Sequence, residues 1–125
     1  EVADPNEVVQ PTTIDGLFAV AAGNCDYDAI SALSRPEFAK TMRAFRESFD
    51  HVIVDAGSVR GSADPLIIGQ HCDVALLATM RDVSAVPSIV AAIDRLRSAG
   101  IRLAGCVVCG TREQASGWKT RRIAG

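Results

Sequence analysis

Residues 49–65 read FDHVIVDAGSVRGSADP, and this stretch decides the fold. Val52–Val54 form a short apolar run, Asp55 follows, and small, flexible residues come next. A short continuous apolar run is typical of a strand covered on both faces in a parallel sheet. In open α/β sheets, ligands bind beyond the carboxyl ends of the strands. We therefore expect Asp55 at the mouth of a crevice, where it either binds Mg²⁺, directly or through water, or only caps the strand.

The sequence contains four short apolar runs of this kind, and segments with helical spacing of apolar residues lie between them. The four expected strands are Leu17–Ala22, Val52–Ala56, Val74–Thr79 and Leu103–Cys109. Strands that alternate with helices are joined by right-handed crossovers, which make neighbouring strands parallel. The sequence therefore predicts an α/β fold, a parallel sheet with flanking helices.

The first expected helix runs from Ser34 to about Phe49. Ser34 and Glu37 have the spacing of a capping box, and Pro36 lies in the first turn. Apolar residues at helical spacing predict one stripe that packs into the core: Phe38, Met42, Phe45 and Phe49.

Two further helices are expected. The first is short, with Asp64 as its N-cap and Pro65 as its first residue, and it ends near Gly69. The second starts after Ser84 and ends at Gly100, a residue suited to the left-handed position that follows a helix.

Composition narrows the class of protein. The 125 residues carry a net charge of −2 and are 48% hydrophobic, which excludes bulk disorder. No run reaches the ~20 apolar residues of a membrane-spanning helix, so no direct membrane insertion is expected. The weak negative charge argues against nucleic-acid binding.

We expect three parts along the chain: a polar leading segment (1–16), an α/β half-domain (17–110) and a basic tail (111–125). Because residue 1 is Glu and not Met, we expect a processed chain or a part of a longer one. No signal peptide is visible, and a cytoplasmic location is expected.

Cys106 and Cys109 have the C-x-x-C spacing of a redox or zinc motif. Both fall in an expected strand, on which residues three apart point to opposite faces. We therefore exclude a shared metal or a redox pair. We expect buried, structural cysteines in a reducing compartment.

Candidate site residues follow the expected strands. They are Asp55, Arg60, Asp64, Arg81, Cys109 and Gly110. Arg60 is placed to reach an anion in its loop, and Arg81 is placed to pair with Asp82. Asp64 is either a helix cap or a second acid at the crevice mouth. Neither histidine has a Cys or Ser partner at a useful spacing, so no nucleophilic triad is expected.

Five segments, in order, carry a resemblance to a known family: GLFAVAAG (16–23), FRESFDHVIVD (45–55), SADP (62–65), CDVALLAT (72–79) and AGIRLAGCVV (99–108). Together they resemble the bacterial tyrosine kinases of capsular and exopolysaccharide biosynthesis, within the deviant Walker ATPase group. The resemblance covers roughly residues 14–110. It implies the C-terminal half of a kinase domain, a partial P-loop NTPase of three layers (α/β/α) that lacks the Walker A part.

The resemblance also implies roles for individual residues. Asp55 falls at the Walker B acid, a catalytic residue that helps to place Mg²⁺, and Asp64 falls at a second catalytic acid. Cys109 and Gly110 fall near the nucleotide base. Mg²⁺ and ATP are then the cofactors of a full-length parent, and none is expected on this chain alone. Arg60 and Arg81 remain candidate nucleotide contacts because of the loops that carry them.

The sequence departs from the family in several places. It contains no G-x-x-x-x-G-K-[ST] phosphate loop, and its only lysines are Lys40 and Lys119. The Walker A′ segment is absent. Ala56–Ser58 replace a pair of prolines, Cys109 replaces an asparagine, and residues 110–125 hold no tyrosine. Without amides and a lysine around the phosphates, phosphoryl transfer cannot be positioned, so we expect this chain alone to be inactive.

Three hypotheses follow. The first is a fragment of an ATP-dependent tyrosine kinase or related ATPase of exopolysaccharide or capsule biosynthesis. The second is a catalytically degenerate regulatory module that binds a membrane polysaccharide co-polymerase or a second copy of itself. The third is an unrelated α/β binding domain, such as a receiver-like fold. The third is disfavoured because the run Leu17–Ala22 ends without an acidic pair and no lysine follows Cys109 directly.

Overall fold

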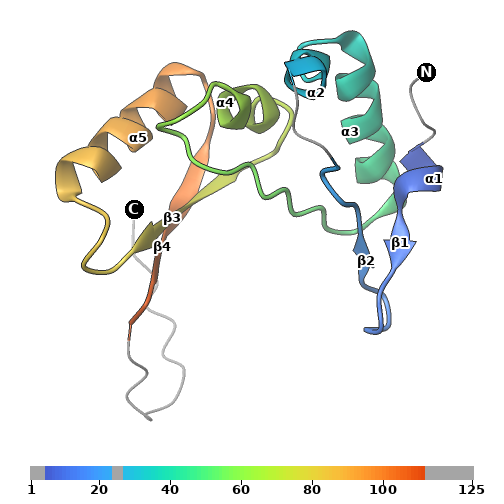
Figure 1. The fold of residues 1–125 in the computed structure, drawn as a ribbon, viewed down its shortest axis with the longest axis horizontal. Coiled ribbons are helices and arrows are strands. Elements are labelled where there is room, and N and C mark those ends of the chain that lie inside the picture. The colour runs from blue at the N-terminus through green and yellow to red at the C-terminus, as the bar shows by residue number, and fades with distance from the viewer. Residues whose placement is uncertain (1–4, 24–26, 112–125) are drawn as a thin grey trace.

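The computed structural model describes residues 5–23 and 27–111, which form two halves joined by an extended segment (Figure 1). The first half contains α1 (Pro5–Val8), β1 (Gln10–Pro11), β2 (Phe18–Ala19), α2 (Tyr27–Ala32) and α3 (Pro36–Ser48). The second half contains α4 (Asp64–Gly69), β3 (Ala75–Met80), α5 (Val86–Ser98) and β4 (Leu103–Cys109).

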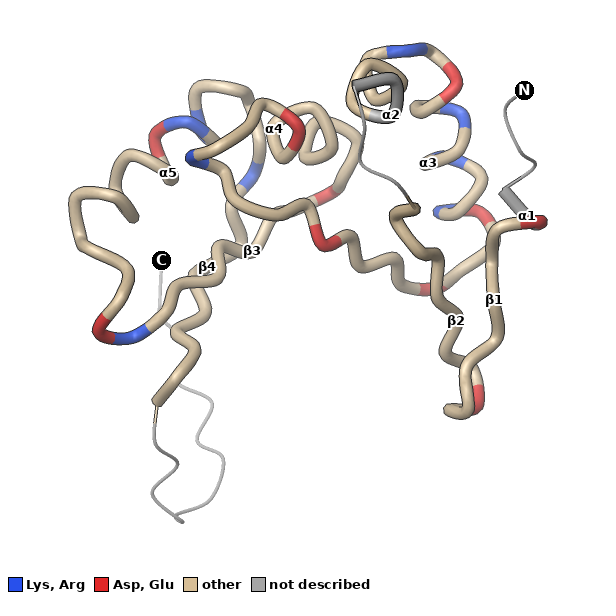
Figure 2. Tube along the Cα trace, viewed as in Figure 1, with Lys and Arg blue, Asp and Glu red and all other residues tan. Residues whose placement is uncertain are grey.

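The second half is a β-α-β unit with a parallel sheet. β3 and β4 pair in parallel from Ala75 opposite Leu103 to Met80 opposite Cys109, and α5 connects them. Neither strand contains a charged residue, as Figure 2 shows by the tan colour along both. The structure confirms the α/β class, the parallel sheet and both expected strands, with β3 shifted by one residue.

The core of this half lies between α5, α4 and the start of β4. Ala92 and Leu96 on α5 are buried, and so is Ile101 in the loop before β4. α5 ends as predicted, because Gly100 follows it with a φ of +74°. A Cβ at Gly69 would lie 2.8 Å from the Ile101 side chain, so glycine lets α4 pack directly against this residue.

α3 confirms the predicted apolar stripe. Met42 is buried, and the Phe45 and Phe49 rings lie 6.4 Å apart between centroids. Across the half, Phe18 lies 5.5 Å from Phe49, which ties β2 to the end of α3. The predicted helix end near Phe49 is also confirmed, since Phe49 is the C-cap.

The start of α3 differs from the prediction. The N-cap is Arg35 and not Ser34, and no side chain caps this helix. The cause is Pro36, because the residue before a proline is pushed out of the helical region. Arg35 accordingly has φ −87° and ψ 151°. The expected capping box of Ser34 and Glu37 is therefore not formed.

The expected parallel strand Leu17–Ala22 is wrong in length and pairing. Only β2 forms there, and it pairs antiparallel with β1, with Gln10 opposite Ala19. A local turn explains the difference: the Thr12 hydroxyl donates to the Leu17 carbonyl at 2.9 Å, and Gly16 adopts φ +73°. The hairpin closes over a few residues, which costs less chain entropy than a distant pairing.

The expected strand Val52–Ala56 is also wrong. Residues 51–58 belong to no helix or strand, and the described residues form two separate two-stranded sheets. Ile53 is 95% exposed. An extended backbone becomes a strand only when a neighbour meets its N–H and C=O groups, and β3 lies across an open groove.

The expectation of buried cysteines is wrong for the β4 pair. Cys106 and Cys109 are exposed, and Cys72 is half-buried. β4 has one neighbouring strand and lacks the covering on both faces that the prediction assumed. Cys25 and the tail from residue 112 lie outside the described residues. Among the helices of residues 5–23 and 27–111, none is long and apolar enough to cross a membrane.

The packing of α5 predicts a large effect of Leu96→Ala. Leu96 is 4% exposed. Removing its buried methyl groups should lower the free energy of unfolding by about 2–5 kcal/mol. The matched control is Val86→Ala on the same helix, where the side chain is 71% exposed. This change should cost no more than about 0.5 kcal/mol. Urea titrations of the three proteins measure both values, and equal losses would contradict this account of the core.

Candidate functional site

The carboxyl ends of β3 and β4 meet and bring three candidate residues together. The Arg81 N–H donates to the Cys109 carbonyl at 2.9 Å, which extends the parallel pairing one step beyond β3. Gly110 follows with φ +76°, and a Cβ there would lie 3.0 Å from the Met80 sulfur. Glycine at 110 is therefore favoured by both backbone conformation and space.

Ser84 closes the turn after β3. From the sequence, this residue was expected only to precede the next helix. The Ser84 hydroxyl accepts from the Met80 N–H at 2.9 Å, and the Ser84 N–H donates to the Met80 carbonyl at 2.9 Å. The expected pair of Arg81 and Asp82 is present, with Nε 3.3 Å from Oδ2. Both side chains are mostly exposed, so this ion pair contributes little stability.

Asp55 lies at the end of the extended segment and is exposed. The Gly57 N–H donates to its Oδ1 at 3.3 Å, and Gly57 has φ +74°, a conformation that favours glycine. This short turn orients the carboxylate and leaves the second oxygen available to a ligand.

The loop after Asp55 is attached to α5. The Arg60 guanidinium donates to the Ser88 hydroxyl at 2.8 Å, and the Arg95 guanidinium donates to the Val59 carbonyl at 2.7 Å. Arg60 was predicted from its place after an expected strand, whereas Ser88 and Arg95 lie too far along the chain from this loop for a local pattern to indicate them.

Asp64 does not join the other candidates. It is the first residue of α4, and its N–H donates to the Ser62 hydroxyl at 3.0 Å. The expected N-cap role is wrong, since the N-cap is Ala63. Asp64 is also absent from the groove that Asp55 and Arg60 line.

That groove has an open volume of about 1340 Å³ and lies between the extended segment, β3, α4 and α5. Within the described part of the chain, no three His, Cys, Asp or Glu side chains gather to hold a metal ion. A single carboxylate nonetheless fits Mg²⁺ in a nucleotide site, where one or two carboxylates and the phosphate oxygens bind it. Three carboxylates line the groove, those of Asp50, Asp55 and Asp73, and Asp55 is the one at the end of the extended segment.

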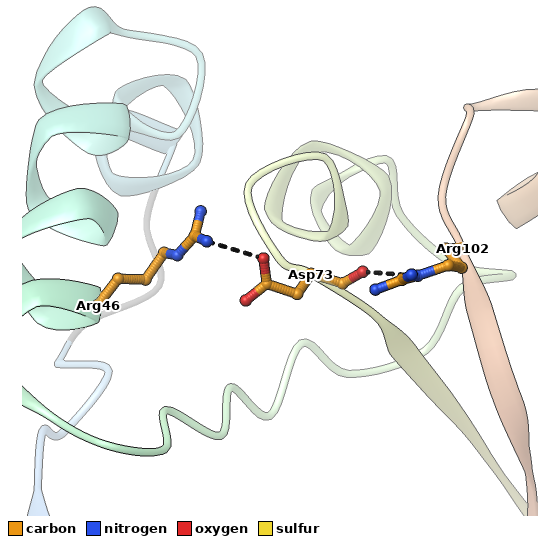
Figure 3. A network of polar contacts seen from close by, with 3 residues as sticks. All are labelled: Arg46, Asp73 and Arg102. Carbon is orange, nitrogen blue, oxygen red and sulfur yellow. Dashed lines mark hydrogen bonds and ion pairs between the residues drawn. The ribbon is translucent and has the colours of Figure 1, made fainter.

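An ion pair and a ring contact join α3 of the first half to residues 71–73 of the second half. Figure 3 shows Asp73, just before β3, between two arginines. The Arg46 Nη2 on α3 lies 2.9 Å from Asp73 Oδ1, and the Arg102 Nε donates to the Asp73 carbonyl at 3.2 Å. Nearby, the Phe38 and His71 rings meet edge to face at 5.4 Å. Arg46, His71 and Asp73 also line the groove, so these contacts fix one end of it.

No family model matches the chain. Its homologues are bacterial tyrosine-protein kinases. It is 24% identical over 111 residues to the tyrosine-protein kinase Ptk of Acinetobacter johnsonii, covering 89% of this chain and 15% of that protein. It is 29% identical over 101 residues to the putative tyrosine-protein kinase EpsB of Ralstonia solanacearum, covering 81% and 14%. It is 21% identical over 111 residues to a putative tyrosine-protein kinase in the cps region of Klebsiella pneumoniae, covering 89% and 15%.

Among solved structures, the BceF tyrosine kinase domain superposes with a TM-score of 0.75 at 25% identity. The match covers 82% of this chain and 43% of that one. The chain is thus similar to the C-terminal part of a tyrosine kinase domain and spans only about 14–15% of the curated relatives it matches.

The burial of Cys72 and the exposure of Cys106 and Cys109 predict different rates of thiol alkylation. Burial, and then the neighbouring Asp73 carboxylate, raise the pKa of the Cys72 thiol. This thiol also lies 3.4 Å from the Ile68 carbonyl. Because the thiolate is the reactive form, Cys72 should react with iodoacetamide more slowly than the exposed Cys106 and Cys109 at pH 8. The rate at Cys72 should rise only at a pH above the ordinary thiol range. Peptide mass spectrometry over time gives the three rates, and faster labelling at Cys72 would contradict this assignment.

Proposed function

We propose that this chain is part of an ATP-dependent protein tyrosine kinase of exopolysaccharide or capsule biosynthesis. The observation that carries the proposal is the similarity over 81–89% of the chain to bacterial tyrosine-protein kinases, one of them in a cps region. The superposition on the BceF kinase domain supports it independently of sequence motifs.

In the proposed kinase, Asp55 helps to hold the Mg²⁺ that accompanies ATP. The ion neutralises charge on the phosphates during transfer. Asp55 is exposed, faces the groove, and is oriented by the Gly57 N–H. The other carboxylate oxygen of Asp55 would coordinate the ion directly or accept a hydrogen bond from a water bound to the ion.

Arg60 and the strand ends supply the remaining nucleotide contacts. Arg60 lines the same groove as Asp55, and its bond to Ser88 fixes the guanidinium while other N–H groups stay available to a phosphate. Arg81, Cys109 and Gly110 lie together at the strand ends, which is where an α/β sheet binds the rest of a nucleotide. Asp64 lies apart from both groups, so its proposed catalytic role has the least geometric support.

A regulatory role is the alternative. Cys109, at the position where the family resemblance expects an asparagine, and Gly57–Ser58, where it expects proline, favour a catalytically degenerate module. Such a module would bind a membrane polysaccharide co-polymerase or a second copy on the cytoplasmic side. A kinase domain that contains this sequence but binds no Mg²⁺-ATP would favour this alternative.

The chain alone should not hydrolyse ATP. It contains no phosphate loop, so nothing in it cradles the transferred phosphate. Labelled ATP incubated with Mg²⁺ and the 125-residue chain should release phosphate at the rate of the buffer blank. Release above that blank, retained through purification and abolished by Asp55→Asn, would refute the expectation.

Asp55→Asn should weaken Mg²⁺-ATP binding in the longer kinase domain that, on this proposal, contains these residues. A charge-assisted contact is worth about 1.5–3 kcal/mol, so affinity should fall about tenfold or more. The matched control is Asp94→Asn on α5, an exposed acid outside the groove. Thermal-shift titrations measure both, and equal affinity of the Asp55 variant and the parent would remove Asp55 from the site.

A further inference from the structure

The hydrogen bonds that join the extended segment and its loop to the rest of the protein all reach α5. Among the described residues, residues 51–61 make three hydrogen bonds to residues outside this range. The Arg60 Nη1 donates to the Ser88 Oγ at 2.8 Å. The Arg95 Nη1 donates to the Val59 carbonyl at 2.7 Å and to the Arg60 carbonyl at 3.5 Å. α5 therefore determines where the loop and the Arg60 side chain lie.

Arg60 and Arg95 bring two positive charges to this loop without a carboxylate bound to either. Two ion pairs occur among the described residues, and neither includes Arg60 or Arg95. Asp94 precedes Arg95 on α5, but it does not line the groove. Both guanidinium groups donate to uncharged oxygens, and each has five N–H donors, so several donors stay available. An anion is the ligand that would balance this charge.

Ser88 adds a donor beside Arg60. The Ser88 Oγ accepts the bond from Arg60, and a serine hydroxyl that accepts one bond still has its own O–H to donate. No acceptor for this O–H lies within hydrogen-bond distance among the described residues. Ser88 is half-buried and is the third residue of α5, in the turn where the helix dipole favours an anion. Ser88 and Arg60 both line the groove.

This donor set fits a phosphate group. A guanidinium can donate two parallel N–H bonds to two oxygens of one phosphate, and the hydroxyl beside it can donate to a third oxygen. Asp55 lines the same groove, and a Mg²⁺ held there would also bind phosphate oxygens. Arg95 does not line the groove, so its contribution is to hold the loop backbone that carries Arg60.

We propose that Arg60 and Ser88 form a phosphate-binding pair and that Arg95 is its positioning residue. Free N–H groups of Arg60 and the O–H of Ser88 donate to the oxygens of one phosphate group. Arg95 holds the loop at the Val59 carbonyl, so that the Arg60 side chain reaches Ser88. This inference rests on the proposed function, and it adds Ser88 as a contact for the nucleotide phosphates and gives Arg95 a role that acts through Arg60.

The test titrates the 125-residue chain with magnesium tripolyphosphate, which has the phosphates of ATP without its base and sugar. NMR shifts of the Arg60, Gly61 and Ser88 amides should saturate. So few contacts bind weakly, so the dissociation constant should be about 1–10 mM. Ser88→Ala should weaken binding about fivefold or more, and Ser88→Thr, which keeps the hydroxyl, should restore it. The matched control is Ser98→Ala on the same helix, an exposed residue outside the groove, and it should bind like the parent.

Arg95→Met tests positioning, because it keeps much of the apolar stem and removes the N–H donors. It should weaken binding several-fold in the parent chain but change little in an Arg60→Gln chain, where there is no guanidinium to position. A purely structural role would give the same loss in both chains. Arg97→Met removes the same charge from an exposed position of α5 outside the groove, and it should have little effect. Thermal unfolding without ligand verifies that each variant is folded.

Several results would overturn the proposal. They are the absence of saturable binding, equal affinity of the parent and the folded Ser88→Ala chain, or an equal loss from Arg95→Met and Arg97→Met. The longer kinase domain separates this proposal from the proposed function. Tripolyphosphate binding that depends on Ser88, in a domain that binds no Mg²⁺-ATP, would count against the kinase function alone. Mg²⁺-ATP binding that Ser88→Ala leaves unchanged would count against the phosphate-binding pair alone.

Discussion

The structure depends on the requirement that backbone N–H and C=O groups of extended chain find partners. β3 and β4 meet it along the edge that they share, and α5 packs beside them with Ala92 and Leu96 buried. β1 and β2 meet it over a two-residue hairpin. Residues 51–57 do not meet it within the described chain, and the groove beside them follows from that. The groove, the exposure of Ile53 and the exposed position of Asp55 all lie along this unpaired segment.

Features set by local sequence could be predicted. The end of α3 at Phe49, the course of α5 to Gly100, and the extent of β4 all follow from apolar spacing and from residues that terminate elements. The parallel pairing of β3 with β4 followed from the helix between them. The start of α3 was predicted one residue early, because Pro36 acts on Arg35 more strongly than the capping pattern of Ser34 does.

Features set by distant partners could not be predicted. An apolar run such as Val52–Val54 indicates that the segment can form a strand, but it does not indicate whether another strand lies beside it. The same limit applies to the site. Position after a strand identified Asp55, Arg60 and Arg81, whereas the bonds that hold the loop to Ser88 and Arg95 join residues more than 25 positions apart. Asp64 was expected at the crevice mouth or as a helix cap, but it is the first residue of α4 and does not line the groove.

The exposed extended segment also bears on how long an unassembled chain survives. Proteases bind their substrates in extended form, and residues 51–57 already have that form, without backbone bonds to break first. Cleavage there would separate α3 from the β3–α5–β4 unit, which an exposed ion pair and one ring contact would not hold together. Proteolysis of this chain should therefore begin in this segment, and a single cut there would be enough to divide the protein.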